Sequence, residues 1–167
     1  MIKKITRFLL RFFKVLWRVL LKLLKQVAGA FIFAMLAALE LGDWTGLLSR
    51  YSNPEKDAAA FGLTTQASSS HLLVMIILSI SIVLTALITV LGLFQDARWI
   101  IRTSQLTGVL FTLYGAYQIY IGLAQATKGR EGLVMAGLVF ILIGAAVFGL
   151  GGKFVHKPKP AQQQPSR

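Results

Sequence analysis

Long apolar runs separated by short polar segments dominate the chain from residue 27 onward. The clearest run covers residues 71–94 and carries no formal charge, and residues 106–127 and 133–152 form two more uncharged runs. A helix needs about 20 apolar residues to cross the hydrocarbon core of a bilayer. All three runs meet that length, so the pattern predicts three membrane-spanning helices.

A fourth apolar run, residues 27–41, precedes these three and is shorter than a span normally needs. Glu40 and Asp43 mark its far end, where Trp44 suits an interfacial aromatic belt. With this run included, the sequence predicts an all-α integral membrane protein, a bundle of four transmembrane helices.

The segment between the first two spans, residues 42–70, is predicted to be a long outer loop. Asn53-Pro54 is a helix-start signal, because proline is favoured at the first helical position and the acidic Glu55 and Asp57 suit the first turn. We expect a short helix from Pro54 to Phe61, followed by a flexible Thr- and Ser-rich stretch. A short basic loop with Arg98 and Arg102 is expected between the second and third spans, at residues 95–105, and a tight turn at residues 128–132 between the last two spans.

Residues 1–26, the leader, follow a different pattern, in which bases recur every third or fourth residue among aromatic and aliphatic side chains. On a helix these bases fall within an arc of about 80°. The bases are Lys4, Arg7, Arg11, Lys14, Arg18, Lys22 and Lys25, and the aromatic residues outside the arc are Phe8, Phe12, Phe13 and Trp17. The pattern predicts an amphipathic interfacial helix that lies on the cytoplasmic leaflet against anionic lipids and then turns near Gly29, or continues with a bend, into the first span.

Other interpretations of the leader compete with this one. A signal peptide needs an uninterrupted apolar stretch, and a nucleic-acid arm has polar residues or glycine between its bases, so the pattern excludes both. A calmodulin-type target has a similar pattern but is usually attached to a soluble domain. The apolar face of the leader can also pack on a partner subunit or on the chain's own bundle.

Positive charge is concentrated at the two ends of the chain. Residues 1–26 hold eight bases and no acid, and the basic, Pro-rich tail at 153–167 adds four bases, in a chain of formal net charge +12. Ends rich in Lys and Arg stay on the cytoplasmic side during insertion. We therefore expect both termini inside, in a bacterial plasma (inner) membrane, and an even number of spans. The tail is expected to be extended or disordered.

Composition limits the possible chemistry. Only 14% of the residues are charged, against about 25% in soluble domains, which excludes a soluble enzyme. The chain has no cysteine, and its two histidines, His71 and His156, lie far apart. No metalloprotease, nucleotide-binding or serine-hydrolase motif occurs. We expect no catalytic residue, no cofactor and no metal site within one chain, although a symmetric oligomer can assemble a ring of His71 side chains.

Glycines recur at intervals of seven in the last two spans, so each set lines one helix face. The third span carries Gly108, Gly115 and Gly122, and the fourth carries Gly137, Gly144 and Gly151. Small residues let helices approach closely in lipid, and a short turn makes the two spans antiparallel neighbours. We expect a tightly packed hairpin with facing glycines; in the alternative interpretation one glycine face packs on another subunit.

Few polar residues lie within the predicted spans. Ser81, Thr85 and Thr89 follow one face of the second span, where their hydroxyls can bond the carbonyl four residues earlier or reach another helix. Gln118 is expected to bond across the bundle, and Glu40 is the one acid inside a predicted span. These five residues are the candidates for a polar site.

Four spans with a glutamate in the first are similar to the pattern of small multidrug exporters, whose glutamate lies in mid-membrane. Glu40 here falls at the outer end of its predicted span, and the long loop and basic leader depart from that pattern. The resemblance implies a transporter, and it rests on Glu40 alone.

Three hypotheses for function follow. The first is a non-catalytic accessory or structural subunit, or membrane-organising component, that assembles with other membrane proteins or with itself and binds no nucleic acid. The second is an oligomeric pore of the holin type, which requires a polar stripe facing its lumen. The third is a small transporter or an enzyme, and it rests on Glu40 alone.

Overall fold

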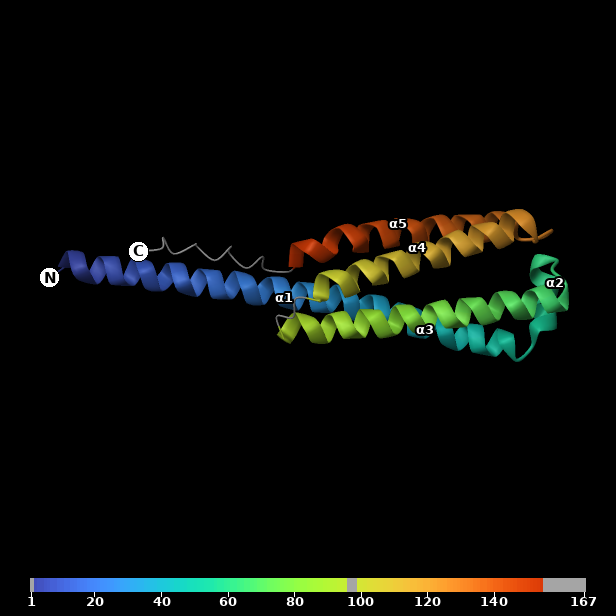
Figure 1. Ribbon diagram of the computed structural model, residues 1–167, viewed down its shortest axis with the longest axis horizontal. Coiled ribbons are helices and arrows are strands. Elements are labelled where there is room, and N and C mark those ends of the chain that lie inside the picture. The colour runs from blue at the N-terminus through green and yellow to red at the C-terminus, as the bar shows by residue number, and fades with distance from the viewer. Residues whose placement is uncertain (1, 96–98, 155–167) are drawn as a thin grey trace, which may run out of the picture.

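The computed structural model describes residues 2–95 and 99–154, with the side chains of residues 11, 13–95 and 99–150. Within these ranges every regular element is a helix: α1 (Ile2–Tyr51), α2 (Pro54–Phe61), α3 (Thr65–Gln95), α4 (Ile100–Ala124) and α5 (Arg130–Phe154). The predicted all-helical class is therefore confirmed (Figure 1). Four of the helices, all except α2, are long and apolar enough to span a membrane.

α1 is one unbroken helix, and at 1.5 Å per residue its 50 residues measure about 75 Å. The side-chain amide of Gln26 donates a hydrogen bond of 2.9 Å to the carbonyl oxygen of Leu93, close to the end of α3. The part of α1 before Gln26 therefore extends beyond the end of α3 (Figure 1). At Gly29 the chain does not turn but continues as a helix.

Most of the predicted loop at residues 42–70 is helical, so the loop prediction is wrong. α1 continues through the first ten residues of this segment, and α3 begins within its last six. Leu47 shows why α1 continues, because its side chain is 3% exposed and packs into the core. The Thr- and Ser-rich stretch starts α3, since the Thr64 hydroxyl accepts a hydrogen bond (3.2 Å) from the backbone N–H of Ala67 and caps the helix.

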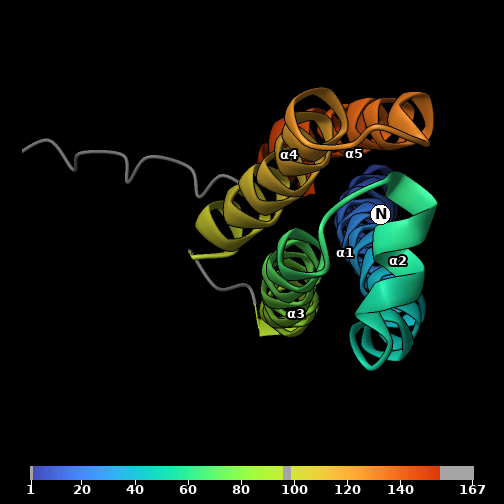
Figure 2. The ribbon, with the colours of Figure 1, turned by 90° about the vertical axis from the view of Figure 1, so that its right-hand side faces the viewer.

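α2 begins at Pro54 and ends at Phe61, as the sequence predicts. Gly62 follows with a φ of 64°, in the left-handed region that terminates helices and favours glycine. Asp57 and Ala58 are its buried residues, so one face of this short helix is turned inward. Viewed from this end of the molecule, α2 lies in front of the end of α1 (Figure 2).

The remaining connections differ from the prediction in their positions. Because α4 starts at Ile100, Arg102 lies in a helix instead of a basic loop. The turn between α4 and α5 covers residues 125–129 and ends at Gly129, which has a φ of 60°. Arg98 and the basic tail after residue 154 lie outside the described residues.

α4 and α5 form a hairpin beside the pair made by α1 and α3 (Figures 1 and 2). The helices of the hairpin approach closely at four glycines. A Cβ built on Gly115 would lie 2.3 Å from the carbonyl oxygen of Gly137, and one built on Gly108 would lie 2.6 Å from that of Gly144. No side chain fits at these distances, because the obstacle is main chain and cannot move aside.

The other two glycines of the predicted seams differ. A Cβ on Gly122 would lie 3.1 Å from the Cβ of Leu133, which is a close side-chain contact but not a main-chain clash. Gly151 lies beyond the described side chains. Between the hairpin and the α1–α3 pair, Phe33, Leu72, Phe111 and Tyr114 are among the largest fully buried side chains of the core.

Candidate functional site

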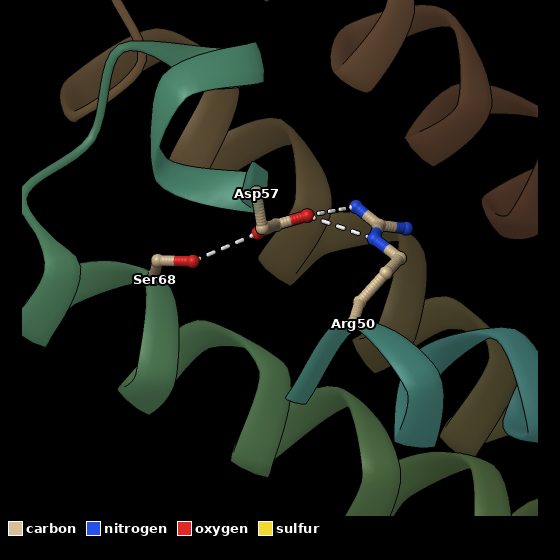
Figure 3. A network of polar contacts seen from close by, with 3 residues as sticks. All are labelled: Arg50, Asp57 and Ser68. Carbon is tan, nitrogen blue, oxygen red and sulfur yellow. Dashed lines mark hydrogen bonds and ion pairs between the residues drawn. The ribbon is translucent and has the colours of Figure 1, made fainter. Parts of the chain in front are cut away.

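Three polar side chains connect α1, α2 and α3 at the end of the molecule where α2 lies. Arg50 donates from Nε to Oδ1 of Asp57 (2.8 Å) and from Nη2 to the same oxygen. Ser68 donates from its hydroxyl to Oδ2 of Asp57 (3.0 Å), as Figure 3 shows. The Asp57 side chain is 1% exposed and that of Arg50 is 43% exposed. This network attaches α2 to both longer helices through one buried carboxylate.

A chamber of about 310 Å³ lies beside this network. All five helices contribute to its wall: Asp43, Leu47 and Arg50 from α1, Phe61 from α2, His71 and Met75 from α3, Tyr114 and Gln118 from α4, and Gly132, Leu133 and Ala136 from α5. The wall therefore combines apolar side chains with five polar or ionisable ones. Apolar clefts with a few convergent polar groups are the usual form of small-ligand sites.

Two side chains of the chamber wall hold polar atoms that have no hydrogen-bond partner. They are Nδ1 of His71 and Oε1 of Gln118. The residues are only 3% and 8% exposed, and the His71 ring stacks on Tyr117 with a centroid separation of 5.6 Å. Buried polar atoms are normally hydrogen-bonded, so two unpartnered atoms beside one cavity point to a ligand. The predicted bond of Gln118 across the bundle is not formed by its Oε1 atom.

Asp43 is the carboxylate of the chamber wall that has no basic partner among the described residues. The Tyr114 hydroxyl donates a hydrogen bond of 2.5 Å to Oδ2 of Asp43 and so connects α1 to α4. The nearby guanidinium of Arg50 is paired instead with Asp57. Asp43 therefore leaves one negative charge on the wall uncompensated by this part of the chain.

Glu40 lies one helical turn before Asp43, and its side chain is 2% exposed. Ser79 donates a hydrogen bond of 3.3 Å to the main-chain carbonyl of Glu40, while Oε2 of Glu40 has no partner. Ser79 is eight residues beyond His71 in α3, about 12 Å along the helix. Because α1 continues to Tyr51, Glu40 lies inside the α1–α3 pair and not at the outer end of a helix, where the sequence analysis placed it.

The hydroxyl groups predicted in the second span bond mainly to their own helix. Ser81 donates to the carbonyl of Ile77 (2.8 Å), and Thr85 donates to that of Ser81 (2.9 Å). Thr89 bonds the carbonyl of Thr85 and also lies 3.1 Å from the Thr103 hydroxyl of α4.

The five candidate polar residues do not come together. Gln118 lines the chamber near α2, whereas Thr89 contacts Thr103 close to the opposite end of α3. No continuous stripe of the kind that a pore requires is formed by Ser81, Thr85, Thr89 and Gln118. Glu40 is one helical turn from the chamber wall and is not part of it.

Sequence analysis missed Asp43, Arg50, Asp57, Ser68 and Tyr114 as members of one site. One signal was present: four acids and an arginine occur between residues 40 and 57 of a chain that has only six acids. A cluster of that density beside a predicted span indicates a polar site even before the partners on α3 and α4 are known.

The described side chains of the leader extend outward along α1. Trp17 is 61% exposed, Leu20 is 55% exposed and Leu24 is 64% exposed. These side chains are not packed on the chain's own bundle, so that alternative interpretation of the leader is wrong for them. The side chains of Lys4, Arg7, Phe8 and Phe12 lie outside the described residues.

Across residues 2–95 and 99–154, no group of three or more His, Cys, Asp or Glu side chains is placed to hold a metal ion. No protein-family model matches the chain, and neither a curated protein nor a solved structure does. The site is therefore interpreted from its own geometry.

Proposed function

We propose that this chain is a non-catalytic integral membrane protein that acts as an accessory or structural subunit, with its leader attached to the anionic cytoplasmic leaflet. The exposed apolar side chains of the leader, Trp17, Leu20 and Leu24, carry this proposal. An apolar face of this width is unstable in water and needs lipid or another protein to cover it. The bases of the leader favour lipid headgroups that carry negative charge.

The proposed orientation follows from the distribution of bases. Both termini lie in the cytoplasm of a bacterial cell, and α2 with the chamber lies on the opposite side of the plasma membrane. The leader then bends toward the membrane surface or packs along a partner helix, because a straight course would carry its apolar face into water.

The first experiment measures the depth of Trp17 in liposomes that contain anionic lipid. Trp44 and Trp99 are replaced by Phe, so that Trp17 is the remaining tryptophan. We expect quenching by lipids brominated near the headgroup and protection from acrylamide. Accessibility equal to that of a free indole contradicts the surface-helix proposal. Crosslinking in native membranes distinguishes lipid contact from contact with a partner subunit.

We also propose that the close glycine contacts hold α4 and α5 together within one chain, instead of serving another subunit. The matched pair is Gly137→Ala and Gly149→Ala, since a Cβ would lie 2.5 Å from a carbonyl oxygen at the first and meets nothing within 4 Å at the second. Gly137→Ala should lower stability in mixed micelles by about 1–3 kcal/mol, and Gly149→Ala should leave it nearly unchanged. Equal effects contradict the intramolecular role.

A second candidate function, transport of a small cation, is supported by Glu40. Ionisable residues inside transmembrane helices are rare and commonly mark ion pathways. The Glu40 side chain is 2% exposed, one of its oxygens is unpartnered, and it lies one turn from a chamber that holds Asp43. Beyond Ser79, the buried apolar residues Ile82, Val83 and Ala86 of α3 separate the chamber end of the bundle from its opposite end. A transporter that works by alternating access needs such a barrier on one side of its binding site.

Transport is tested in proteoliposomes that hold a pH-sensitive dye and are driven by a potassium diffusion potential. The wild-type chain should move protons faster than empty liposomes, and Glu40→Gln should abolish the difference. Glu55→Gln is the matched control, because Glu55 is an exposed acid of α2 away from the chamber wall. Flux that persists in Glu40→Gln removes the support for transport.

A further inference from the structure

The chamber beside α2 is lined by one carboxylate that has no basic partner among the described residues and by two buried polar atoms without a hydrogen-bond partner, and we propose that it binds a small primary ammonium ion, R–NH₃⁺. This proposal goes beyond the role of the leader and names a ligand class for the chamber, which lies one helical turn from Glu40, the residue that supports the transport proposal. An ammonium ion can bind to the chamber at equilibrium whether or not the protein transports ions. Calorimetry therefore tests the binding proposal, and proton flux in proteoliposomes tests the transport proposal.

The charge of the ligand follows from the pairing of the wall residues. Arg50 directs two of its nitrogens to one oxygen of Asp57, which balances its charge. Asp43 has no base within salt-bridge distance in the described part of the chain, and the Tyr114 hydroxyl that bonds it is neutral. Asp43 is exposed, so water reaches its carboxylate in the free protein, and a cationic ligand in the chamber would give this charge the partner that the described chain does not supply.

The number of N–H donors follows from the acceptors. An ammonium group has three N–H bonds and no acceptor. Three wall residues can accept them: the carboxylate of Asp43, Oε1 of Gln118, and Nδ1 of His71 in the tautomer that carries its proton on Nε2. The last two atoms have no other partner. The three acceptors belong to different helices, Asp43 to α1, Gln118 to α4 and His71 to α3, so the ligand would connect three helices of the bundle.

The rest of the ligand follows from the apolar part of the wall. Leu47, Phe61, Met75 and Leu133 line the same chamber, so they can contact an alkyl or aryl group attached to the nitrogen. The volume of about 310 Å³ accommodates a ligand of several carbon atoms. A quaternary ammonium ion has the charge and the apolar surface but no N–H, and would leave Gln118 and His71 unpartnered.

The test is isothermal titration calorimetry of the full-length chain in lipid nanodiscs, with empty nanodiscs as the blank. The probes are n-butylammonium and n-butyltrimethylammonium, which share an alkyl chain and a charge. We expect n-butylammonium to bind at least about tenfold more tightly than the quaternary ion, because charge-assisted hydrogen bonds contribute to the first only. No binding of n-butylammonium, or equal affinity of the two ions, overturns the proposal.

Two variants locate the binding in the chamber. Asp43→Asn keeps an oxygen for the Tyr114 hydroxyl and removes the charge, and it should weaken n-butylammonium binding by about tenfold. Glu55→Gln removes the same charge outside the chamber and should change the affinity less than twofold. An unchanged affinity in Asp43→Asn, or an equal loss in both variants, overturns the proposal.

Gln118→Met decides the question if Asp43→Asn does not fold. Because Oε1 of Gln118 has no partner, an apolar side chain of similar length should preserve or raise the stability of the free protein. It should weaken n-butylammonium binding by about threefold or more and leave the quaternary ion unaffected. Equal affinity of wild type and Gln118→Met for n-butylammonium contradicts the assignment of this acceptor.

Discussion

The two halves of α1 belong to one helix, but the first half, the leader, has exposed apolar side chains, whereas the second half buries one face against the rest of the bundle. In the leader, Trp17 and Leu20 are 61% and 55% exposed. In the second half, Phe33 and Ala37 are each 2% exposed, and so is the acidic Glu40. Burial in this helix therefore depends on whether α3 lies alongside, and not on how apolar a residue is. The leader presents its apolar side chains to something outside the chain.

The charges of the two halves differ in the same way. The described bases of the leader are exposed, whereas the second half carries Glu40 and Asp43 and ends at Arg50, which is paired across to α2. The second half therefore holds charged groups in contact with other helices of the chain, such as the Arg50–Asp57 pair, whereas the described charged groups of the leader are exposed. Three experiments test this difference between the two halves of α1, and the largest effect on stability is expected for the substitution in the tightly packed core.

Phe33→Ala should destabilise the protein by about 3–5 kcal/mol, because it leaves a cavity between packed helices. Leu20→Ala, an apolar truncation in the same helix, should change stability by less than about 0.5 kcal/mol, since no part of the bundle packs on it. Unfolding by sodium dodecyl sulfate in mixed micelles, followed by circular dichroism, measures both. A similar loss in the two variants would show that the leader does pack on the bundle.

Replacing Arg11, Lys14 and Arg18 with Gln should weaken attachment of the leader to anionic membranes by about 3 kcal/mol, at about 1 kcal/mol for each base. The readout is Trp17 quenching by brominated lipid as the anionic fraction is raised, in the variant whose other tryptophans are Phe. In purely zwitterionic liposomes the same substitutions should have little effect. High salt should reproduce part of the loss in the unsubstituted leader, because salt screens exposed charges.

Asp57→Asn should destabilise the α2 end by about 1–3 kcal/mol, because it leaves Arg50 without its anionic partner while Arg50 is only half-buried. Glu55→Gln, in the same helix but exposed, should change stability by less than about 0.5 kcal/mol. Hydrogen exchange of α2 amides resolves the effect locally. Identical exchange rates in the two variants would mean that the Arg50–Asp57–Ser68 network does not hold α2.

Sequence reasoning predicted those parts of the fold that depend on neighbouring residues. The four long apolar runs correspond to four long helices, because length and composition are local properties. The bounds of α2 were predicted from the proline that starts it and from the acids of its first turn, and the structure adds Gly62 as the residue that ends it. The Thr- and Ser-rich start of α3 was misread, since its composition suggests flexibility while Thr64 acts as a helix cap.

The chamber could not be predicted in the same way. Asp43 and Tyr114 are 71 residues apart in sequence and meet only because α1 and α4 pack against a common core. The depth of Glu40 depended on where α1 ends, and the contact of Leu47 with the core decides that. Gln118 was recognised as unusual, but its position beside His71 follows from the packing of α3 against α4.

The unbroken course of α1 has a mechanical consequence. A helix of 50 residues behaves as a stiff rod, and Gln26 fastens it to the end of α3 near its midpoint. With about 37 Å of helix on either side of that point, a tilt of about 5° displaces each tip by about 3 Å. The second half of α1 is packed into the core, so it tilts only together with the bundle, and the leader, as the other part of the same helix, transmits that tilt to whatever lies at its tip.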